Sequence, residues 1–189
     1  MASQDLCTQD EVKEYIDMPG GSSDADDVID DLITRVSDRF AKYCGITQFK
    51  SQSYTEYYSG QGTQELFLDQ RPIISITSIK QDSEWAFGSD STFASDNYAI
   101  QDDRVVLKDN VFSSGVRNLQ VIYTAGYSTI PGDLKQACIE EVARAFDKRS
   151  NVDITNRTLT DGTAFTMRQN SLMPDTVDVL KRYMGIGVY

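Results

Sequence analysis

The chain has 189 residues, a formal net charge of −11 and a pI near 4.4. This length suits one domain with a core, or one domain with an appendage, but not two large domains. The acidic balance argues against a nucleic-acid-binding surface, which needs clustered lysine and arginine. We find no run of about 18 apolar residues and no basic-then-apolar start, so we expect no membrane span, no signal peptide and synthesis in the cytoplasm.

The sequence contains no histidine, the commonest general base and the commonest transition-metal ligand. Nucleophile pairs that depend on histidine are therefore excluded. Cys7, Cys44 and Cys138 form no closely spaced pair, so reduced, buried thiols are favoured over a reactive thiol. We predict no catalytic residue, no metal site and no cofactor. Among enzymes, a hydrolase that uses two carboxylates remains as an alternative.

The first predicted element is a short helix over about residues 8–17. Thr8 and Glu11 are spaced as a capping box, and Cys7 and Val12 are spaced as a hydrophobic staple. So short a helix is not stable alone. We therefore expect it to dock on another helix.

A long helix is predicted over about residues 24–44, with Ser22 or Ser23 as its N-cap and Gly45 at its end. Its apolar residues form a stripe about five turns long: Val28, Ile29, Leu32, Val36, Phe40, Tyr43 and Cys44. Its first two turns hold Asp24, Asp26, Asp27, Asp30 and Asp31. A solvated helix start is favoured over a calcium site, because the glycine and the bidentate glutamate of a calcium loop are missing.

Residues 51–127 change to short β-like runs separated by Gly, Ser, Asn and Asp, which predicts a small, mainly antiparallel sheet inserted between helices. The runs are 54–58, 65–68, 73–79, 98–100, 104–107 and 119–124. Gly60 and Gly62 are typical of a hairpin turn here, not of a phosphate loop, because no helix follows them. Trp85, Phe87 and Phe93 belong to a polar loop. They either cover the sheet, which we favour, or contact a partner.

Residues 118–150 organise the chain, because a strand there turns into the most regular helix. Pro131 is expected at or just before the first turn of a helix over about residues 132–149. The apolar face is expected to comprise Leu134, Ala137, Cys138, Val142, Ala145 and Phe146. The charged residues are expected away from that face: Lys135, Glu140, Glu141, Arg144 and Lys148.

The last segment, residues 151–189, differs from the rest of the chain. It carries 4 acids and 4 bases, whereas residues 1–50 carry 11 acids and 5 bases. Residues 151–170 show little apolar periodicity, and a short helix is expected over residues 174–183. We therefore predict a core over residues 1–150 and a C-terminal arm over residues 151–189. The fold class is α+β: a small α-helical bundle, an inserted mainly antiparallel β region and an extended arm.

Four sequence stretches occur in an order that is similar to one family. They are TQDEVKEY at residues 8–15, RFAKYCG at 39–45, RPIISITSI at 71–79, and YTAGY at 123–127 followed by IPGDLKQA at 130–137. Together they resemble the head-tail connector (adaptor, head completion) proteins of tailed bacteriophages, the gp6-like family. The resemblance covers roughly residues 4–149. No catalytic residue is carried across, because the family resembled is structural.

The resemblance implies a structural virion protein, assembled in the host cytoplasm, which forms a ring beneath the portal and joins the DNA-filled head to the tail. The implied partners are the portal protein, neighbouring copies in a twelvefold ring and a tail or stopper protein. DNA would only pass through the channel, and no membrane is involved.

From the arm's composition we predict a portal or neighbour interface made by its apolar residues: Leu172, Met173, Leu180, Tyr183, Met184, Ile186, Val188 and Tyr189. A host protein-binding adaptor is the main alternative, because nothing in the composition excludes it. The carboxylate-dependent hydrolase is the second alternative.

Overall fold

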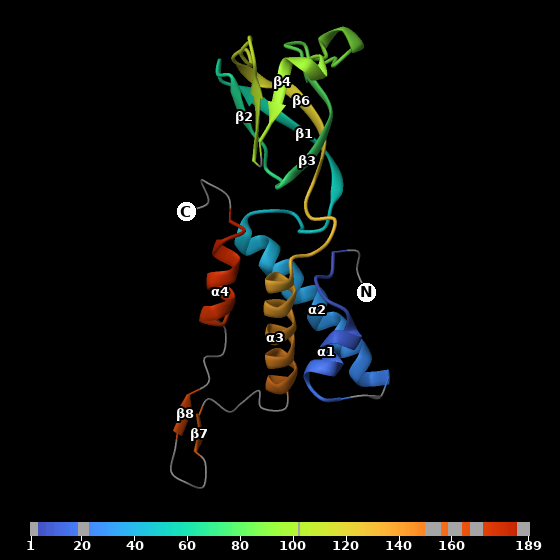
Figure 1. Cartoon of the computed structure of the whole chain (residues 1–189), viewed down its shortest axis with the longest axis vertical. Coiled ribbons are helices and arrows are strands. Elements are labelled where there is room, and N and C mark those ends of the chain that lie inside the picture. Colours follow the sequence, from blue (N-terminus) through green and yellow to red (C-terminus); the bar gives the residue numbers. More distant parts are fainter. Residues whose placement is uncertain are drawn as a thin grey trace. The chain divides into compact units, whose positions relative to one another are not determined.

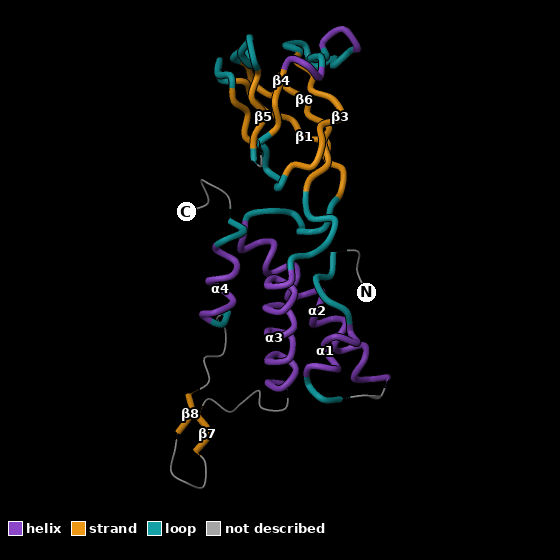
Figure 2. Tube along the Cα trace, viewed as in Figure 1, coloured by secondary structure: helices purple, strands orange, loops and turns teal. Residues whose placement is uncertain are grey.

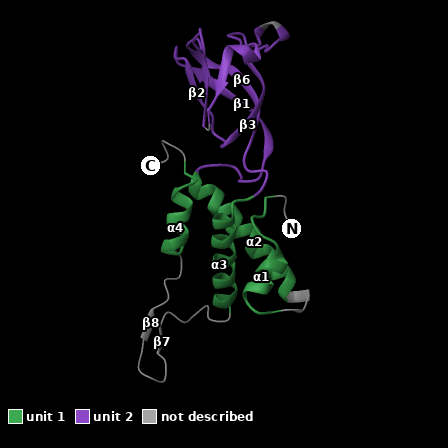
Figure 3. Cartoon of the chain, in the orientation of Figure 1, with its two compact units in different colours: residues 1–44, 130–184 green, residues 45–129, 185–189 purple. Residues whose placement is uncertain are grey.

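The computed structural model describes residues 4–18, 23–101, 103–149, 156–158, 164–166 and 172–184. The chain divides into two compact units (Figure 3). Residues 1–44 and 130–184 form the first, which we call the helical unit, and residues 45–129 and 185–189 form the second, the β unit. The predicted mixed α+β class is confirmed. In the described parts of the chain, no helix is long and apolar enough to cross a membrane.

Within its described residues, the helical unit contains four helices (Figure 1). They are α1 (Gln9–Tyr15), α2 (Ser23–Cys44), α3 (Gly132–Lys148) and α4 (Pro174–Lys181). Helices α2 and α3 contact each other, and each of them also contacts α1 and α4, so these two helices form the centre of the unit. The short α1 docks on α2 and α3, as its length required.

Local signals explain where these helices begin and end. The Thr8 hydroxyl accepts from the Glu11 amide at 3.3 Å, and the Glu11 carboxylate accepts from the Thr8 amide at 2.9 Å, which confirms the capping box. Gly45 has φ 69° after α2, the left-handed conformation expected of a residue that ends a helix. Pro131 is the N-cap of α3.

The buried row of α2 is offset from the stripe expected from the sequence. Ile29, Phe40 and Cys44 are fully buried, as predicted. Four other residues of the predicted stripe are only half-buried: Val28, Leu32, Val36 and Tyr43. Ile33, Ser37 and Ala41, which were not part of that stripe, complete the buried row. The helix therefore has a second, half-buried apolar row beside its core-facing row.

Among its described residues, the β unit holds two antiparallel three-stranded sheets, not the single small sheet that was expected. Figure 2 shows these strands in orange. Its strands are β1 (Gln52–Gly60), β2 (Glu65–Phe67), β3 (Ile73–Gln81), β4 (Tyr98–Ile100), β5 (Arg104–Leu107) and β6 (Gly115–Ala125). The strand orders are β1-β6-β3 and β2-β5-β4. Strands β2 and β4 both pair with β5, whereas β1 and β3 both pair with β6, so two separate sheets form.

The core of the β unit is built around β6. Its residues Leu119, Val121, Tyr123 and Ala125 are all fully buried, at the two-residue spacing of one strand face. Residues from both sheets join them in one cluster: Tyr54, Leu66, Leu68, Ile73, Ile79, Val105, Leu107 and Phe112. The strand that ends in the YTAGY stretch is therefore the central strand of its sheet.

The C-terminal segment is partly described. Strands β7 (Asn156–Thr158) and β8 (Ala164–Thr166) pair antiparallel, in a stretch for which the sequence predicted no clear structure. Helix α4 starts at Pro174, as expected, and ends at Lys181. Because α4 contacts α3 and α2, the described residues 172–184 belong to the helical unit. The division into a core and a separate arm remains a prediction.

Candidate assembly surfaces

Helix α4 is anchored to α3 by a buried carboxylate. The Glu141 side chain is 4% exposed and accepts the backbone N–H of Met173, the N-cap of α4, at 2.5 Å. The Arg144 guanidinium donates to the same carboxylate at 2.6 Å. Glu141 therefore meets the positive end of α4 and a cation together, which offsets the cost of its burial. The sequence placed Glu141 among the charged residues away from the apolar face, and the structure corrects this.

The far end of α4 is tied down as well. The Tyr183 hydroxyl donates to Asp133 at 2.5 Å, and the Arg182 guanidinium lies 3.5 Å from the same carboxylate. Between these ends, Thr176 and Leu180 are 1% and 0% exposed. Helix α4 thus contributes side chains to the core of the helical unit.

An open groove of about 560 Å³ runs along α4. It is lined by Arg144, Leu172, Met173, Pro174, Val177, Asp178 and Lys181. Leu172, Met173 and Val177 are half-buried, whereas Asp178 and Lys181 are exposed and pair at 2.8 Å. The groove is therefore lined by apolar residues together with charged ones, a composition common in protein-binding grooves.

The structure sorts the residues predicted for the portal or neighbour interface. Leu172 and Met173 line the groove, and Tyr183 and Met184 are half-buried near the end of α4. Leu180 is fully buried inside its own unit, so its side chain has no exposed surface to offer another chain. The remaining three predicted residues lie outside the described residues: Ile186, Val188 and Tyr189. Val177 also lines the groove, although it was not among the residues predicted for this interface.

A second surface lies on the β unit, and we call its five residues the aromatic patch: Tyr57, Trp85, Phe87, Val116 and Arg117. Trp85 is 61% exposed and Val116 is 73% exposed. The Tyr57 and Phe87 rings are 5.5 Å apart, and the Arg117 guanidinium lies 5.4 Å from the Tyr57 ring. Exposed apolar side chains that gather in this way are typical of contact surfaces.

The loop that carries Trp85 and Phe87 is held by specific hydrogen bonds. Asp82 accepts from the amides of Glu84 at 2.8 Å and Phe87 at 2.9 Å. Lys80 donates to the Phe87 carbonyl at 2.9 Å, and the Trp85 indole N–H donates to the Val116 carbonyl at 3.0 Å. The patch is therefore presented by an ordered loop.

Three residues of the aromatic patch have a strained backbone conformation. Trp85, Phe87 and Arg117 have φ values of 62°, 49° and 49°, in the left-handed region that bulky residues rarely adopt. Strain of this kind is found most often at functional positions. Phe93, the third aromatic residue expected in this loop, instead packs edge-on against Phe112 at 5.8 Å. The expectation that these aromatics cover the sheet thus holds for Phe93 but not for Trp85.

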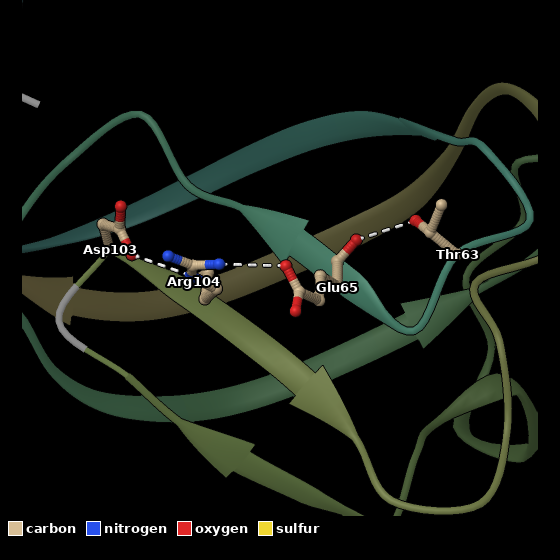
Figure 4. A network of polar contacts seen from close by, with 4 residues as sticks. All are labelled: Thr63, Glu65, Asp103 and Arg104. Carbon is tan, nitrogen blue, oxygen red and sulfur yellow. Dashed lines mark hydrogen bonds and ion pairs between the residues drawn. The ribbon is translucent and has the colours of Figure 1, made fainter. Parts of the chain in front are cut away.

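A polar network occupies the outer face of the smaller sheet (Figure 4). Arg104 donates to Asp103 at 3.1 Å and to Glu65 at 2.9 Å, and it lies 4.6 Å from the Phe67 ring. Thr63 donates to the Glu65 carbonyl at 2.9 Å. Glu65 is half exposed, and exposed ion pairs contribute little to stability. We interpret this face as a solvated surface, because Arg104 already pairs with both carboxylates, Asp103 and Glu65.

A network around the half-buried carboxylate of Glu56 bears on the hydrolase alternative. Glu56 accepts from the hydroxyls of Tyr58 and Tyr123, and the Gln70 side chain donates to it at 3.3 Å. Burial, together with Glu56, raises the pKa of both tyrosines. Burial and Glu56 also raise the pKa of Asp69. Since the Glu56 oxygens are occupied by these donors, the network ties β1 and β6 together and offers no free acid-base pair.

Metal binding receives no support from the described part of the chain, where no group of three or more Asp, Glu or Cys side chains is placed to hold an ion. This applies to the aspartates of α2 for which side chains are described.

The sequence from residue 5 to residue 184 matches the family model of the head completion protein. The chain belongs to the head completion protein family. The resemblance to phage head-tail connector proteins is therefore confirmed, and so is the predicted function class, a structural protein that joins head and tail. The family match also favours this assignment over the alternative of a host protein-binding adaptor. A search of curated protein sequences gave no match to the chain.

Solved structures share the fold of this head completion protein. The neck of an empty gene transfer agent (GTA) particle, computed with C6 symmetry, matches with a TM-score of 0.62, 12% identity, and coverage of 96% of this chain and 90% of that chain. The native neck, computed with C12 symmetry, matches with a TM-score of 0.57, 13% identity, and coverage of 95% and 89%. The virion of the native particle matches with a TM-score of 0.58, 15% identity, and coverage of 96% and 90%. At these identities the likeness shows the fold.

The motif residues of this head completion protein hold the fold together. Tyr123 is buried and bonded, and Gly126 has φ 108° with the Lys50 carbonyl oxygen 2.7 Å from where a Cβ would stand. Leu134 is fully buried, and Lys135 pairs with Glu11 at 2.8 Å. These contacts give a physical reason for the YTAGY and PGDLKQA stretches without any catalytic role.

Proposed function

We propose that this head completion protein forms a ring beneath the portal, joins the DNA-filled head to the tail and leaves a channel for the genome. The observation that carries the proposal is the α4 groove, an open apolar surface within the region that the family model matches. The portal protein is the proposed occupant of the groove, with Leu172, Met173 and Val177 as its apolar contacts. Beyond the described residues, Ile186, Val188 and Tyr189 extend the proposed portal contact.

Neighbouring copies are proposed to meet along α2. Its half-buried apolar row, Val28, Leu32 and Val36, lies beside the row that faces the core. Packing against another helix would complete the burial of these side chains. The solved necks with a similar fold were computed with C6 and C12 symmetry, which supports a ring that is twelvefold like the portal.

The charge of the protein suits a joint through which DNA passes. A chain with net charge −11 would repel a DNA backbone instead of retaining it. The proposed role is therefore binding and ordering of other proteins, without enzymatic activity. We place the protein in the virion at the head-tail junction, after assembly in the host cytoplasm and without a membrane. A tail or stopper protein would bind on the other side of the ring.

The test is cryo-electron microscopy of portal-bearing, DNA-filled heads mixed with the purified protein. Removing residues 151–189 would also remove Leu180 from the core of the helical unit, so a groove variant is the better probe. Val177→Lys places a charge among the apolar residues that line the groove. Asp175→Asn changes an exposed residue of the same helix that does not line the groove. We expect ring density below the portal with the unaltered protein and with Asp175→Asn, and at least tenfold lower occupancy with Val177→Lys. Full occupancy with Val177→Lys would contradict the proposed portal contact.

A further inference from the structure

Two of the three buried cysteines lie side by side in the helical unit. The Sγ atoms of Cys7 and Cys138 are 3.7 Å apart, and the two residues are 4% and 0% exposed. A disulfide bond is about 2.05 Å long, so a small shift would bring these sulfurs into bonding distance. We propose that Cys7 and Cys138 are an oxidisable pair, whose disulfide fastens the N-terminal segment to α3.

The surrounding contacts hold the segment that carries Cys7 against the helices beside Cys138. The Leu6 amide donates to Ser37 of α2 at 3.1 Å, directly before Cys7. One turn earlier on α3 than Cys138, Lys135 pairs with Glu11 at 2.8 Å. The N-terminal segment is thus attached on both sides of the thiol pair. The disulfide would form within a geometry that already exists in the reduced protein.

The same environment keeps the pair reduced until an oxidant reaches it. The hydrogen bond with Cys7, followed by burial, raises the pKa of the Cys138 thiol well above its ordinary value. Thiolate is the reactive form, so reaction in the closed state is slow. Local opening of the segment before α1 would expose Cys7 first. Cys44, the third cysteine, donates its thiol to the Leu180 carbonyl at 3.5 Å.

The oxidant is a low-molecular-weight disulfide such as glutathione disulfide. The Cys7 thiolate attacks one sulfur of the oxidant, which forms a mixed disulfide and releases one small thiol. The Cys138 thiolate then attacks the Cys7 sulfur and releases the second small thiol. Two protein thiols become one disulfide, and the oxidant gains the two electrons and two protons. The chemistry does not depend on the proposed function, but a particle that leaves a reducing cell would meet such oxidants.

The experiment uses the full-length protein, reduced and desalted, then held for one day in glutathione disulfide below its unfolding temperature. After denaturation, free thiols are alkylated and the intact mass is measured, and a peptide map identifies any cross-link. Cys7→Ser removes the pair, and Cys44→Ser is the matched control that leaves it intact. Thermal unfolding is recorded with and without a reducing agent.

We expect one alkyl group on the oxidised protein and three on the reduced protein, with a cross-link between the peptides of Cys7 and Cys138. The disulfide closes a long loop, so the unfolding temperature should rise by about 10 °C in the unaltered protein and in Cys44→Ser, but not in Cys7→Ser. Three free thiols after one day, a persistent glutathione adduct, a cross-link that includes Cys44, or a stable Cys7–Cys138 bond without a thermal shift would each overturn the proposal.

Discussion

Replacing Glu141 by alanine should release α4 from the helical unit. The Glu141 side chain is 4% exposed and accepts from the Met173 amide at 2.5 Å and from Arg144 at 2.6 Å. Alanine leaves the N-terminus of α4 without its acceptor and Arg144 without this carboxylate. The consequence should extend beyond stability, because Met173 lines the groove along α4.

The size of the effect can be worked out from these contacts. Hydrogen bonds to charged groups contribute about 1.5 to 3 kcal/mol each, and breaking a buried ion pair costs about 3 to 5 kcal/mol. Arg144 is 29% exposed, so water recovers part of the loss on its side. We therefore expect Glu141→Ala to lower the free energy of unfolding by about 3 kcal/mol. Glu141→Gln keeps an oxygen for the Met173 amide and should lose about half as much.

Urea denaturation followed by circular dichroism measures this free energy, and Glu140→Ala is the matched control. Glu140 is the neighbouring acid on α3, and it accepts from the Gln136 side chain at 2.9 Å in an exposed hydrogen bond. Limited trypsin digestion supplies a second readout, because Lys181 at the end of the released helix and Arg182 after it should be cut faster. If Glu141→Ala stays within about 1 kcal/mol of the Glu140→Ala control and is cut at the same rate, Glu141 does not anchor α4.

Three further predictions concern single positions. Burial raises the pKa of Glu11, but the ion pair with Lys135 and the helix-capping bonds outweigh it, so the net pKa is lowered. The stabilisation is then present above the unfolded pKa of about 4.3 and lost as the pH falls through the folded pKa, so Glu11→Gln should destabilise the protein at about pH 6 and not at about pH 3 in urea titrations. Gly126→Ala, with φ 108° and a Cβ 2.7 Å from the Lys50 oxygen, should cost at least about 2 kcal/mol of unfolding free energy; a neutral result would contradict the strain. Trp85→Ser should leave the free energy of unfolding within about 0.5 kcal/mol and reduce incorporation into assembled necks, whereas unchanged incorporation would exclude the aromatic patch as a contact.

Local sequence signals were sufficient for most elements. The capping box at Thr8, the left-handed Gly45 and the N-cap Pro131 are all where the sequence predicted them. Each depends on residues within a few positions of one another, so no distant partner was needed to recognise it. The same holds for the strand runs, whose short β-branched and aromatic segments match the observed strands to within a few residues.

The pairing of distant segments was decided only by the tertiary structure. The amphipathic pattern of α3 predicted that Glu141 lies away from the apolar face. That pattern depends on α3 alone, whereas Glu141 is buried because the N-terminus of α4 packs beside it. Similarly, Cys7 and Cys138 are 131 positions apart, and no spacing rule brings their sulfurs to 3.7 Å. The division of the β region into two sheets depends on which strands pair. The loop that presents Trp85 is fixed by hydrogen bonds to Asp82, which the sequence did not predict. Periodicity reports which face of an element is buried, whereas the partner on that face is set by the packing of the whole chain.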